Sequence, residues 1–222
     1  MARPQYKYIL LNKPFGVLPQ FTDKLGRPTL KDLVPFENIY PVGRLDLDSE
    51  GLMLLTDDGE LNHYLSSPKN KQPKTYWAQV EGTPDERSLI TLRKGIVIEG
   101  KKTLPAGVKM IDEPKNLWPR LKPIRFRKNI PTSWLEITLH EGRNRQVRKM
   151  TAAAGFPCLR LIRISIGSLE LGELKPGQFR EIDPSIIRPG HDWIRSYPAG
   201  DELRGRDQLS TPRTNLGNCS II

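Results

Sequence analysis

The sequence predicts an α+β protein with a mixed, largely antiparallel central sheet flanked by helices and loops. Segments with strand character outnumber segments with helix character along the 222-residue chain. Their connections alternate between hairpin-like turns and long loops, whereas a doubly wound parallel sheet requires regular alternation of strands and helices. This length suits one large domain or two small ones.

The first expected strand covers residues 6–11 (YKYILL), which alternate at first, become apolar and end at Asn12-Lys13-Pro14. Residues 29–33 (TLKDL) predict a short helix. A loop containing glycine follows at residues 41–50 and runs into residues 51–56 (GLMLLT). Because this last segment is apolar throughout, we expect a strand buried on both faces.

Asp58 is a suitable N-cap for a helix over residues 59–66, where two leucines lie four positions apart. The alternation and β-forming residues of KTYWAQVEG predict a strand over residues 74–82. Thr83-Pro84-Asp85 then opens a helix that ends near Gly95.

The remaining elements follow from the same signals. A helix is expected over residues 146–154, because QVRKMTAAA is followed by Gly155. Further strands are expected at residues 96–98, 107–111, 133–139, 158–165 and 178–182.

The last 40 residues, 183–222, differ in composition from the rest of the chain. They hold four Pro, four Gly, four Ser, five Arg and five acidic residues, and they show no clear periodicity. We therefore expect a poorly ordered C-terminal extension, with a docked strand or helix over residues 186–197 as the alternative. The whole net charge of +10 then belongs to residues 1–182.

Several classes of protein are excluded by composition and motifs. No apolar run reaches the roughly 18 residues of a membrane span, and no signal peptide opens the chain. Two cysteines, Cys158 and Cys219, do not make a disulfide scaffold, so the cytoplasm is the expected location. The three histidines are scattered, and no His/Cys spacing suits a metal; no glycine-rich nucleotide loop is present.

Positive charge is concentrated in two clusters. Residues 115–134 contain six basic residues and no acidic one, interleaved with Trp118, Phe126 and Trp134. Residues 141–163 contain six more cations against Glu141 alone. Cations attract phosphates and aromatic rings stack on bases, so the pattern predicts a nucleic-acid partner. The alternative is an ordinary solvated surface. The expected RNA-binding residues are Arg120, Lys122, Arg125, Arg127, Lys128, Arg143, Arg145 and Lys149.

The loop Gly43-Arg44-Leu45-Asp46 is the sharpest candidate for chemistry, because it precedes the apolar strand expected at residues 51–56. A guanidinium near a carboxylate can keep the acid ionised and oriented. Such a carboxylate can act as a nucleophile or a base at a sugar carbon. A structural Arg–Asp pair in a loop is the alternative.

The stretch GRLDLDSEGLMLLTDDG resembles the active-site motif of the pseudouridine synthases, in the branch that includes the RsuA and RluB/E/F enzymes. The segments LNKPFGVL, KTYWAQVEG, EGRNRQVRKMTAAAGFPCLRLIRISIG and ELKPGQFREI resemble further motifs of the family in the same order. The resemblance covers about residues 6–182, which we take as the catalytic domain within residues 1–182.

Within this branch, VLPQFTD, LWPR and IPTSWLEITLHEGRNRQVRKMTA resemble the E-type subgroup of the large-subunit ribosomal enzymes. That resemblance implies the pseudouridine synthase fold without a separate S4-type RNA-binding domain. It also implies a monomeric enzyme that isomerises a specific uridine of ribosomal RNA, expected to be 23S, with no cofactor, metal or membrane partner.

The resemblance also assigns roles. Asp46 matches the catalytic aspartate, Tyr76 the active-site tyrosine, and Arg148 the basic residue that pairs with the aspartate. Arg145 replaces Arg148 if the alignment is shifted by one helical turn. We would abandon this hypothesis if Tyr76 and Arg148 lay far from Asp46.

Three further residues are expected to bind substrate: Arg44, Leu161 and Lys13. Arg44 is expected to fill the gap left by an extruded base or to orient Asp46 and a phosphate. Leu161 matches an apolar residue that packs under the base, with Leu159 as the alternative. Lys13 is expected to steady the site or bind phosphate, with a surface lysine as the alternative.

Two other functions remain open from the sequence. One is a ribosome assembly factor that has kept the scaffold and lost catalysis. The other is a sugar hydrolase in which Asp48 or Glu50 supplies the second carboxylate.

Overall fold

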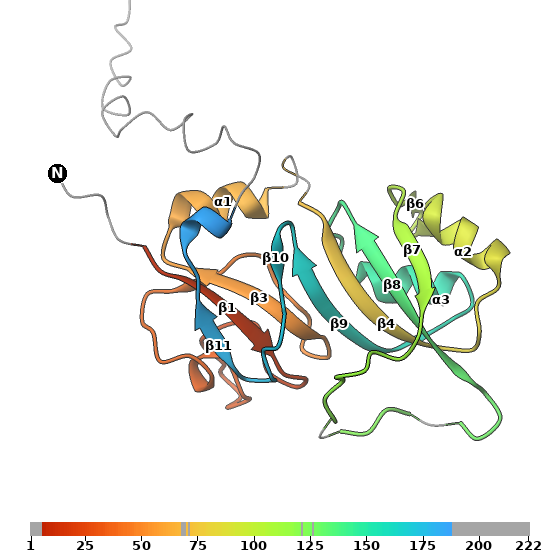
Figure 1. The fold of residues 1–222 in the computed structure, drawn as a ribbon, viewed down its shortest axis with the longest axis horizontal. Helices are drawn as coiled ribbons and strands as arrows, with labels where there is room; N and C mark the ends of the chain where they lie inside the picture. The colour runs from red at the N-terminus through yellow and green to blue at the C-terminus, as the bar shows by residue number, and fades with distance from the viewer. Residues whose placement is uncertain (1–5, 68–69, 71, 121, 126, 188–222) are drawn as a thin grey trace, which may run out of the picture. The chain divides into compact units, whose positions relative to one another are not determined.

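The computed structural model describes residues 6–187 except 68, 69, 71, 121 and 126. These residues form a mixed, largely antiparallel sheet with helices and loops packed around it, so the expected fold class is confirmed (Figure 1). The strands are β1 Tyr8–Lys13, β2 Tyr40–Pro41, β3 Glu50–Thr56, β4 Lys74–Glu81, β7 Gly107–Ile111, β8 Thr132–Leu139, β9 Cys158–Ile166, β10 Leu169–Glu170 and β11 Phe179–Glu181. A separate two-stranded sheet contains β5 Val97–Ile98 and β6 Lys101–Lys102.

The main sheet has the strand order β11-β1-β3-β9-β4-β8-β7, with β2 added to β3 and β10 added to β9. Only the β3–β9 pair is parallel among the described strands. The helices are α1 Gly59–Ser66, α2 Glu86–Arg93 and α3 Gln146–Ala153, and two short 3₁₀ helices are η1 Leu30–Asp32 and η2 Pro184–Ile186.

Local chemistry explains where the helices begin. Asp58 caps α1 by accepting a hydrogen bond from the Leu61 amide at 2.9 Å, as the sequence predicts. The segment at residues 29–33 forms only the 3₁₀ helix η1, in which Thr29 and Asp32 make a capping box. Asp85 is the N-cap of α2, so Pro84 precedes the helix rather than lying in its first turn.

Two hydrophobic cores lie on either side of the β3–β9 junction. One joins β1 and β3 through residues such as Leu11 and Met53, and the other joins β4, β8, β9, α2 and α3 through residues such as Leu135 and Leu161. At the junction, Gly51 has φ +104°, and a Cβ atom there would lie 2.3 Å from the Arg163 carbonyl oxygen. Glycine is therefore required for the two strands to meet.

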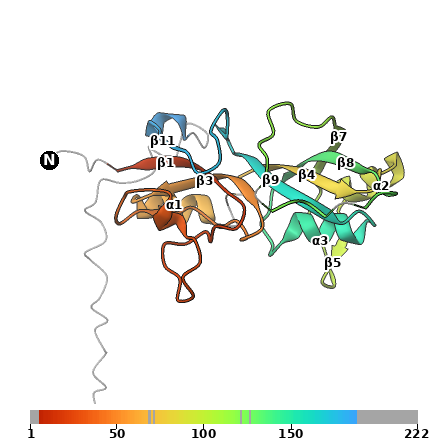
Figure 2. The ribbon, with the colours of Figure 1, turned by 90° about the horizontal axis from the view of Figure 1, so that it is seen from below.

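Strand register assigns side chains to the two faces of the sheet, because successive side chains alternate. Tyr76 pairs with Arg163, and Ala78 pairs with Leu161, so these four residues share the face covered by α3. Glu50 pairs with Ile162 and lies on the opposite face, together with Arg160. Figure 2 shows α3 against one side of the sheet, with the loop between β7 and β8 extending on the other.

The described part of the chain continues past the expected domain end at residue 182. Ile187 is only 4% exposed, and the Ser168 hydroxyl donates to the Ile186 carbonyl at 3.0 Å. Residues 188–222, which make up most of the expected extension, lie outside the described residues. The described residues contain no helix of the length and apolarity that a bilayer crossing demands.

Candidate active site and nucleic-acid interface

Asp46 lies in the turn that leads into β3. The Ser49 amide donates to the Asp46 carbonyl at 3.1 Å, and the Ser49 hydroxyl lies 3.5 Å from Asp46 Oδ2. The preceding Leu45 is buried in the β1–β3 core, while the Asp46 side chain is 29% exposed. The turn therefore presents a partly solvated carboxylate on a fixed backbone.

Arg145 is the cation within ion-pair distance of Asp46 in the described structure. It occupies the N-cap position of α3 with φ +51°, a left-handed conformation. Its guanidinium donates to both oxygens of Asp48 at 2.8 and 2.7 Å and lies 3.5 Å from Asp46 Oδ2. This bidentate contact is the main cause that holds the pKa of Asp48 below its ordinary value.

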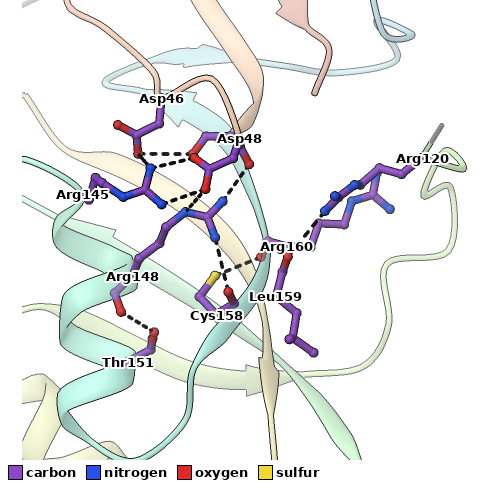
Figure 3. Close-up of polar contacts among 10 residues, drawn as sticks. Asp46, Asp48, Arg120, Arg145, Arg148, Thr151, Cys158, Leu159 and Arg160 are labelled. Atoms are coloured by element: carbon purple, nitrogen blue, oxygen red, sulfur yellow. Dashed lines mark hydrogen bonds and ion pairs between the residues drawn. The ribbon is translucent and has the colours of Figure 1, made fainter. Parts of the chain in front are cut away.

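Arg148 lies one turn further along α3 and joins Asp48 to β9. It donates to the Asp48 carbonyl at 2.7 Å and to the Cys158 carbonyl at 3.3 Å, and its Nε lies 3.5 Å from Asp48 Oδ2. Figure 3 shows Arg145 and Arg148 extending from α3 toward the aspartate loop. The arginine within ion-pair distance of Asp46 is thus Arg145, the residue of the alternative alignment, whereas Arg148 contacts the loop through Asp48.

Tyr76 packs against both hydrophobic cores from the middle of the sheet. One of these cores contains Leu45, the neighbour of Asp46, and the other contains Leu161. Leu161 is 5% exposed, so it is a core residue of the sheet, and Tyr76 packs between the core that contains it and the core that contains Leu45.

Lys13 is fully buried, so the alternative of a surface lysine is wrong. Its ammonium donates to the Pro14 and Val17 carbonyls, both at 2.8 Å, and fixes the turn after β1. Burial lowers the pKa of Lys13 to about 8, although the carboxylates of Glu50, Asp48 and Asp46 oppose the shift. This burial favours the structural part of the expectation over phosphate binding.

The low pKa of Lys13 predicts a pH-dependent stability. Between the folded value of about 8 and the ordinary 10.5, the unfolded chain holds a proton that the folded chain lacks. The free energy of unfolding therefore rises as the pH increases from about 8 to 10.5. Below pH 8 the folded chain holds Lys13 in its charged form and carries the full free-energy cost of burying that charge. Relative to Lys13→Met, the wild-type free energy of unfolding should rise by up to about 3 kcal/mol from pH 7 to pH 10.5. Urea titrations of both proteins measure this difference, and an unchanged difference would contradict the burial argument.

Arg44 is exposed, and the contacts of Asp46 come from Arg145 and Ser49 instead. In the described structure Arg44 is therefore not among the residues that contact the Asp46 side chain. Cys158 does not compete as a nucleophile, because burial raises its pKa to about 11.

The eight expected RNA-binding residues divide into two groups. Three are exposed cations on the loop between β7 and β8: Lys122, Arg125 and Lys128. The others make contacts within the protein: Arg120 stacks on Phe15 at 3.8 Å, Arg127 pairs with Glu81, Arg143 donates to the Ile98 and Lys101 carbonyls, Arg145 binds Asp48, and Lys149 pairs with Glu99. The sequence pattern could not separate free cations from cations with a structural partner.

A pocket of about 470 Å³ lies beside the exposed cations. Arg125, Lys128, Asn129 and Gln79 contribute its polar atoms, and Ile124 and Pro131 contribute apolar surface. Among the described residues that line it, none is acidic. Phe126, one of the aromatic residues singled out by the sequence, lies outside the described residues.

Sequence reasoning missed the cluster that anchors this loop. The buried Glu50 accepts two hydrogen bonds from Arg160, at 2.9 and 2.8 Å, and one from the Trp118 indole at 2.7 Å. Arg160 also donates to the Trp118 carbonyl at 2.9 Å. Glu50 is the first residue of β3, the strand that follows the Asp46 turn. The Trp118 contacts therefore attach the basic loop, residues 112–131 between β7 and β8, to the start of this strand.

Within the described ranges no group of His, Cys, Asp and Glu side chains could hold a metal ion.

Comparison with known families is decisive: a model described as RNA pseudouridylate synthase matches residues 7–153. This chain belongs to the RNA pseudouridylate synthase family. The family resemblance inferred from the motifs is therefore confirmed.

Known members of the RNA pseudouridylate synthase family resemble the chain over most of its length. Ribosomal large subunit pseudouridine synthase E of Vibrio parahaemolyticus is 57% identical over 176 residues, which are 79% of this chain and 74% of the relative. The protein of that name from Xanthomonas campestris is 51% identical over 82% of this chain and 98% of its own length. These matches confirm the expected resemblance to the E-type subgroup.

Solved structures agree with the family assignment. A crystal structure of a pseudouridylate synthase superimposes with a TM-score of 0.68 at 30% identity, covering 82% of this chain and 72% of that one. Human RNA pseudouridylate synthase domain containing 1 shares the fold, with a TM-score of 0.54 at 15% identity and coverage of 90% and 95%.

Proposed function

We propose that this pseudouridine synthase acts in the cytoplasm as a monomer and isomerises a specific uridine of large-subunit (23S) ribosomal RNA. The observation that carries the proposal is the 51% identity to a large-subunit enzyme across 98% of that enzyme's length. We assign the reaction to residues 1–182 and give residues 183–222 no part in it.

The reaction needs no redox step and no group donor. The N1–C1′ bond of uridine breaks, the base turns, and a C5–C1′ bond forms; C5 then loses its proton and N1 gains one. Asp46 supplies the carboxylate that attacks, stabilises or deprotonates at this centre, as carboxylates do at the anomeric carbon in glycosidases. The Arg145 guanidinium lies 3.5 Å from Oδ2 of this acid, so a cation stands beside the reacting carboxylate.

The base must leave the RNA stack before it can react, and this extrusion costs a few kcal/mol. Tyr76 provides a ring against which the base stacks, and Leu161 provides apolar surface beneath it. The exposed Arg44 fills the space left in the RNA or holds a phosphate. Arg148 orients the aspartate loop through Asp48 rather than through Asp46 itself.

The proposal is tested by incubating the purified protein with large-subunit ribosomal RNA labelled with tritium at uridine C5. Isomerisation releases the label to water, and mapping of the product identifies the position. Pseudouridine maps of both ribosomal subunits from cells with and without the gene provide the cellular test. No release and unchanged maps would favour the assembly-factor alternative.

Affinity for the RNA is expected to depend on salt through the three exposed cations of the β7–β8 loop. Replacing Lys122, Arg125 and Lys128 together with glutamine should make the slope of log affinity against log salt concentration less negative by about two to three. Filter binding from 50 to 300 mM KCl measures the slope. As a control, Arg93→Gln removes a cation that pairs with Glu86 on α2 and should leave the slope unchanged. An affinity that is independent of salt in the wild type would contradict this interface.

A further inference from the structure

Two arginines of β9 are buried, and their surroundings differ. Arg160 is paired with Glu50 through two hydrogen bonds. Arg163 is 2% exposed, and its Nε donates to the Leu52 carbonyl at 2.8 Å. Among the described residues, Arg163 makes no ion pair, and its buried Nη2 has no hydrogen-bond partner. A buried guanidinium in this state is costly unless it serves a purpose.

The charged groups near Arg163 increase this cost. Lys13 and Lys74 are both close enough for Arg163 to lower their pKa values. These are like charges, so they repel the guanidinium. Burial has the largest effect on Arg163 and lowers its pKa. Tyr76 acts in the opposite direction and favours the charged form of the guanidinium. Tyr76 is paired with Arg163 across the two strands, so its phenol oxygen is the neighbouring group able to accept a hydrogen bond from the buried cation.

The sheet brings these two side chains together at an irregular point. Tyr76 pairs with Arg163, whereas its neighbour Thr75 pairs with Ser165, so Ile164 is left over as a β-bulge. A bulge redirects the side chains next to it and strengthens the local twist. Leu161 lies two residues before Arg163 on the same face. Arg163 therefore lies on the same face of the sheet as Tyr76 and Leu161.

We propose that Arg163 is a positioning residue that holds the Tyr76 hydroxyl in one orientation beneath the uracil. The inference rests on the proposed function, in which Tyr76 contacts the extruded base. A ring that packs between two cores is fixed in its plane, but the direction of its hydroxyl depends on a hydrogen-bond partner. The Leu52 carbonyl fixes the Arg163 guanidinium, so the donor is preorganised before RNA binds.

A double-mutant cycle tests the proposal. Arg163→Gln, Tyr76→Phe and the double variant are compared by tritium release in single turnovers, with enzyme in excess over RNA. Arg163→Gln should lower the rate by about 10- to 100-fold with RNA affinity retained. In the Tyr76→Phe background it should cause almost no further loss, because the hydroxyl through which it acts is gone. Arg163→Lys, which keeps a buried cation, should recover part of the rate.

Arg160→Gln is the matched control, since it removes a buried arginine of the same strand on the opposite face. Its effect on the rate should be additive with that of Tyr76→Phe. An additive effect of Arg163→Gln, with Tyr76→Phe impaired, would overturn the positioning role and leave the proposed function intact. Full activity of Tyr76→Phe would instead remove the tyrosine from the proposed site, and the inference would fail with it.

Loss of folding is separated from loss of positioning by thermal unfolding of each variant. If Arg163→Gln does not fold, Arg163→Lys completes the cycle. A crystal structure of the wild-type protein gives an independent answer. A direct hydrogen bond from the guanidinium to the Tyr76 hydroxyl would support the role, whereas a carboxylate paired with Arg163 in its place would overturn it.

Discussion

Replacing Asp46 with asparagine is expected to abolish pseudouridine formation, with a loss on the order of 10⁴-fold or more, while RNA binding survives. The amide has the shape of the carboxylate but can neither attack carbon nor accept a proton as a base. The loop should keep its conformation, because Arg145 and Arg148 hold it through Asp48. Tritium release and filter binding measure the two properties separately.

The matched control is Asp48→Asn, two residues away in the same loop. This change weakens the bidentate contact with Arg145 and the ion pair with Arg148, so thermal stability and activity should fall together. Asp46→Asn should lower activity alone. Wild-type rates for Asp46→Asn would show that the reacting carboxylate is a different one.

Local signals predicted most of the fold. The apolar run at residues 51–56 and the cap at Asp58 correspond to β3 and α1 within one residue, because burial and capping depend on neighbouring residues. The two-residue strands β2, β6 and β10 were not predicted, because so short a segment shows no period; β5 was predicted as residues 96–98. The order of strands depends on pairings between distant segments, and it was not predicted.

The candidate site was predicted as a set of residues but not as a set of contacts. The motifs identified Asp46, Tyr76 and Leu161, and their action at one site stays a prediction; the structure packs Tyr76 against the cores that contain Leu45 and Leu161. The partner of Asp46 is Arg145 rather than Arg148, although both arginines contact the aspartate loop. Arg145 has a left-handed conformation at the N-cap of α3. No pattern in the sequence signals that conformation at an arginine.

The same contacts weaken the sugar-hydrolase alternative. That reaction requires a second carboxylate that is free to act on the substrate. Asp48 is held by two arginines, and Glu50 is 1% exposed beneath Arg160 and Trp118. Both acids therefore have structural partners, and Asp46 is left as the carboxylate open to the substrate.

Removing one partner of the buried pair between Glu50 and Arg160 is expected to destabilise the fold strongly. Glu50→Gln leaves the Arg160 guanidinium charged, 4% exposed and without an anion, which should lower the free energy of unfolding by about 3–5 kcal/mol. Urea denaturation measures this as a lower midpoint at an unchanged slope. Glu86→Gln, which breaks the exposed pair with Arg93, should cost less than about 1 kcal/mol.

A second variant separates the cost of an unpaired charge from the value of the pair. Glu50→Gln combined with Arg160→Met removes both charges, so it should recover part of the stability lost in Glu50→Gln alone. Because Glu50 also accepts from the Trp118 indole, either change should loosen the basic loop and weaken RNA binding. If the double variant were less stable than Glu50→Gln, the other contacts of Arg160, such as its hydrogen bond to the Trp118 carbonyl, would outweigh the cost of the lone buried charge.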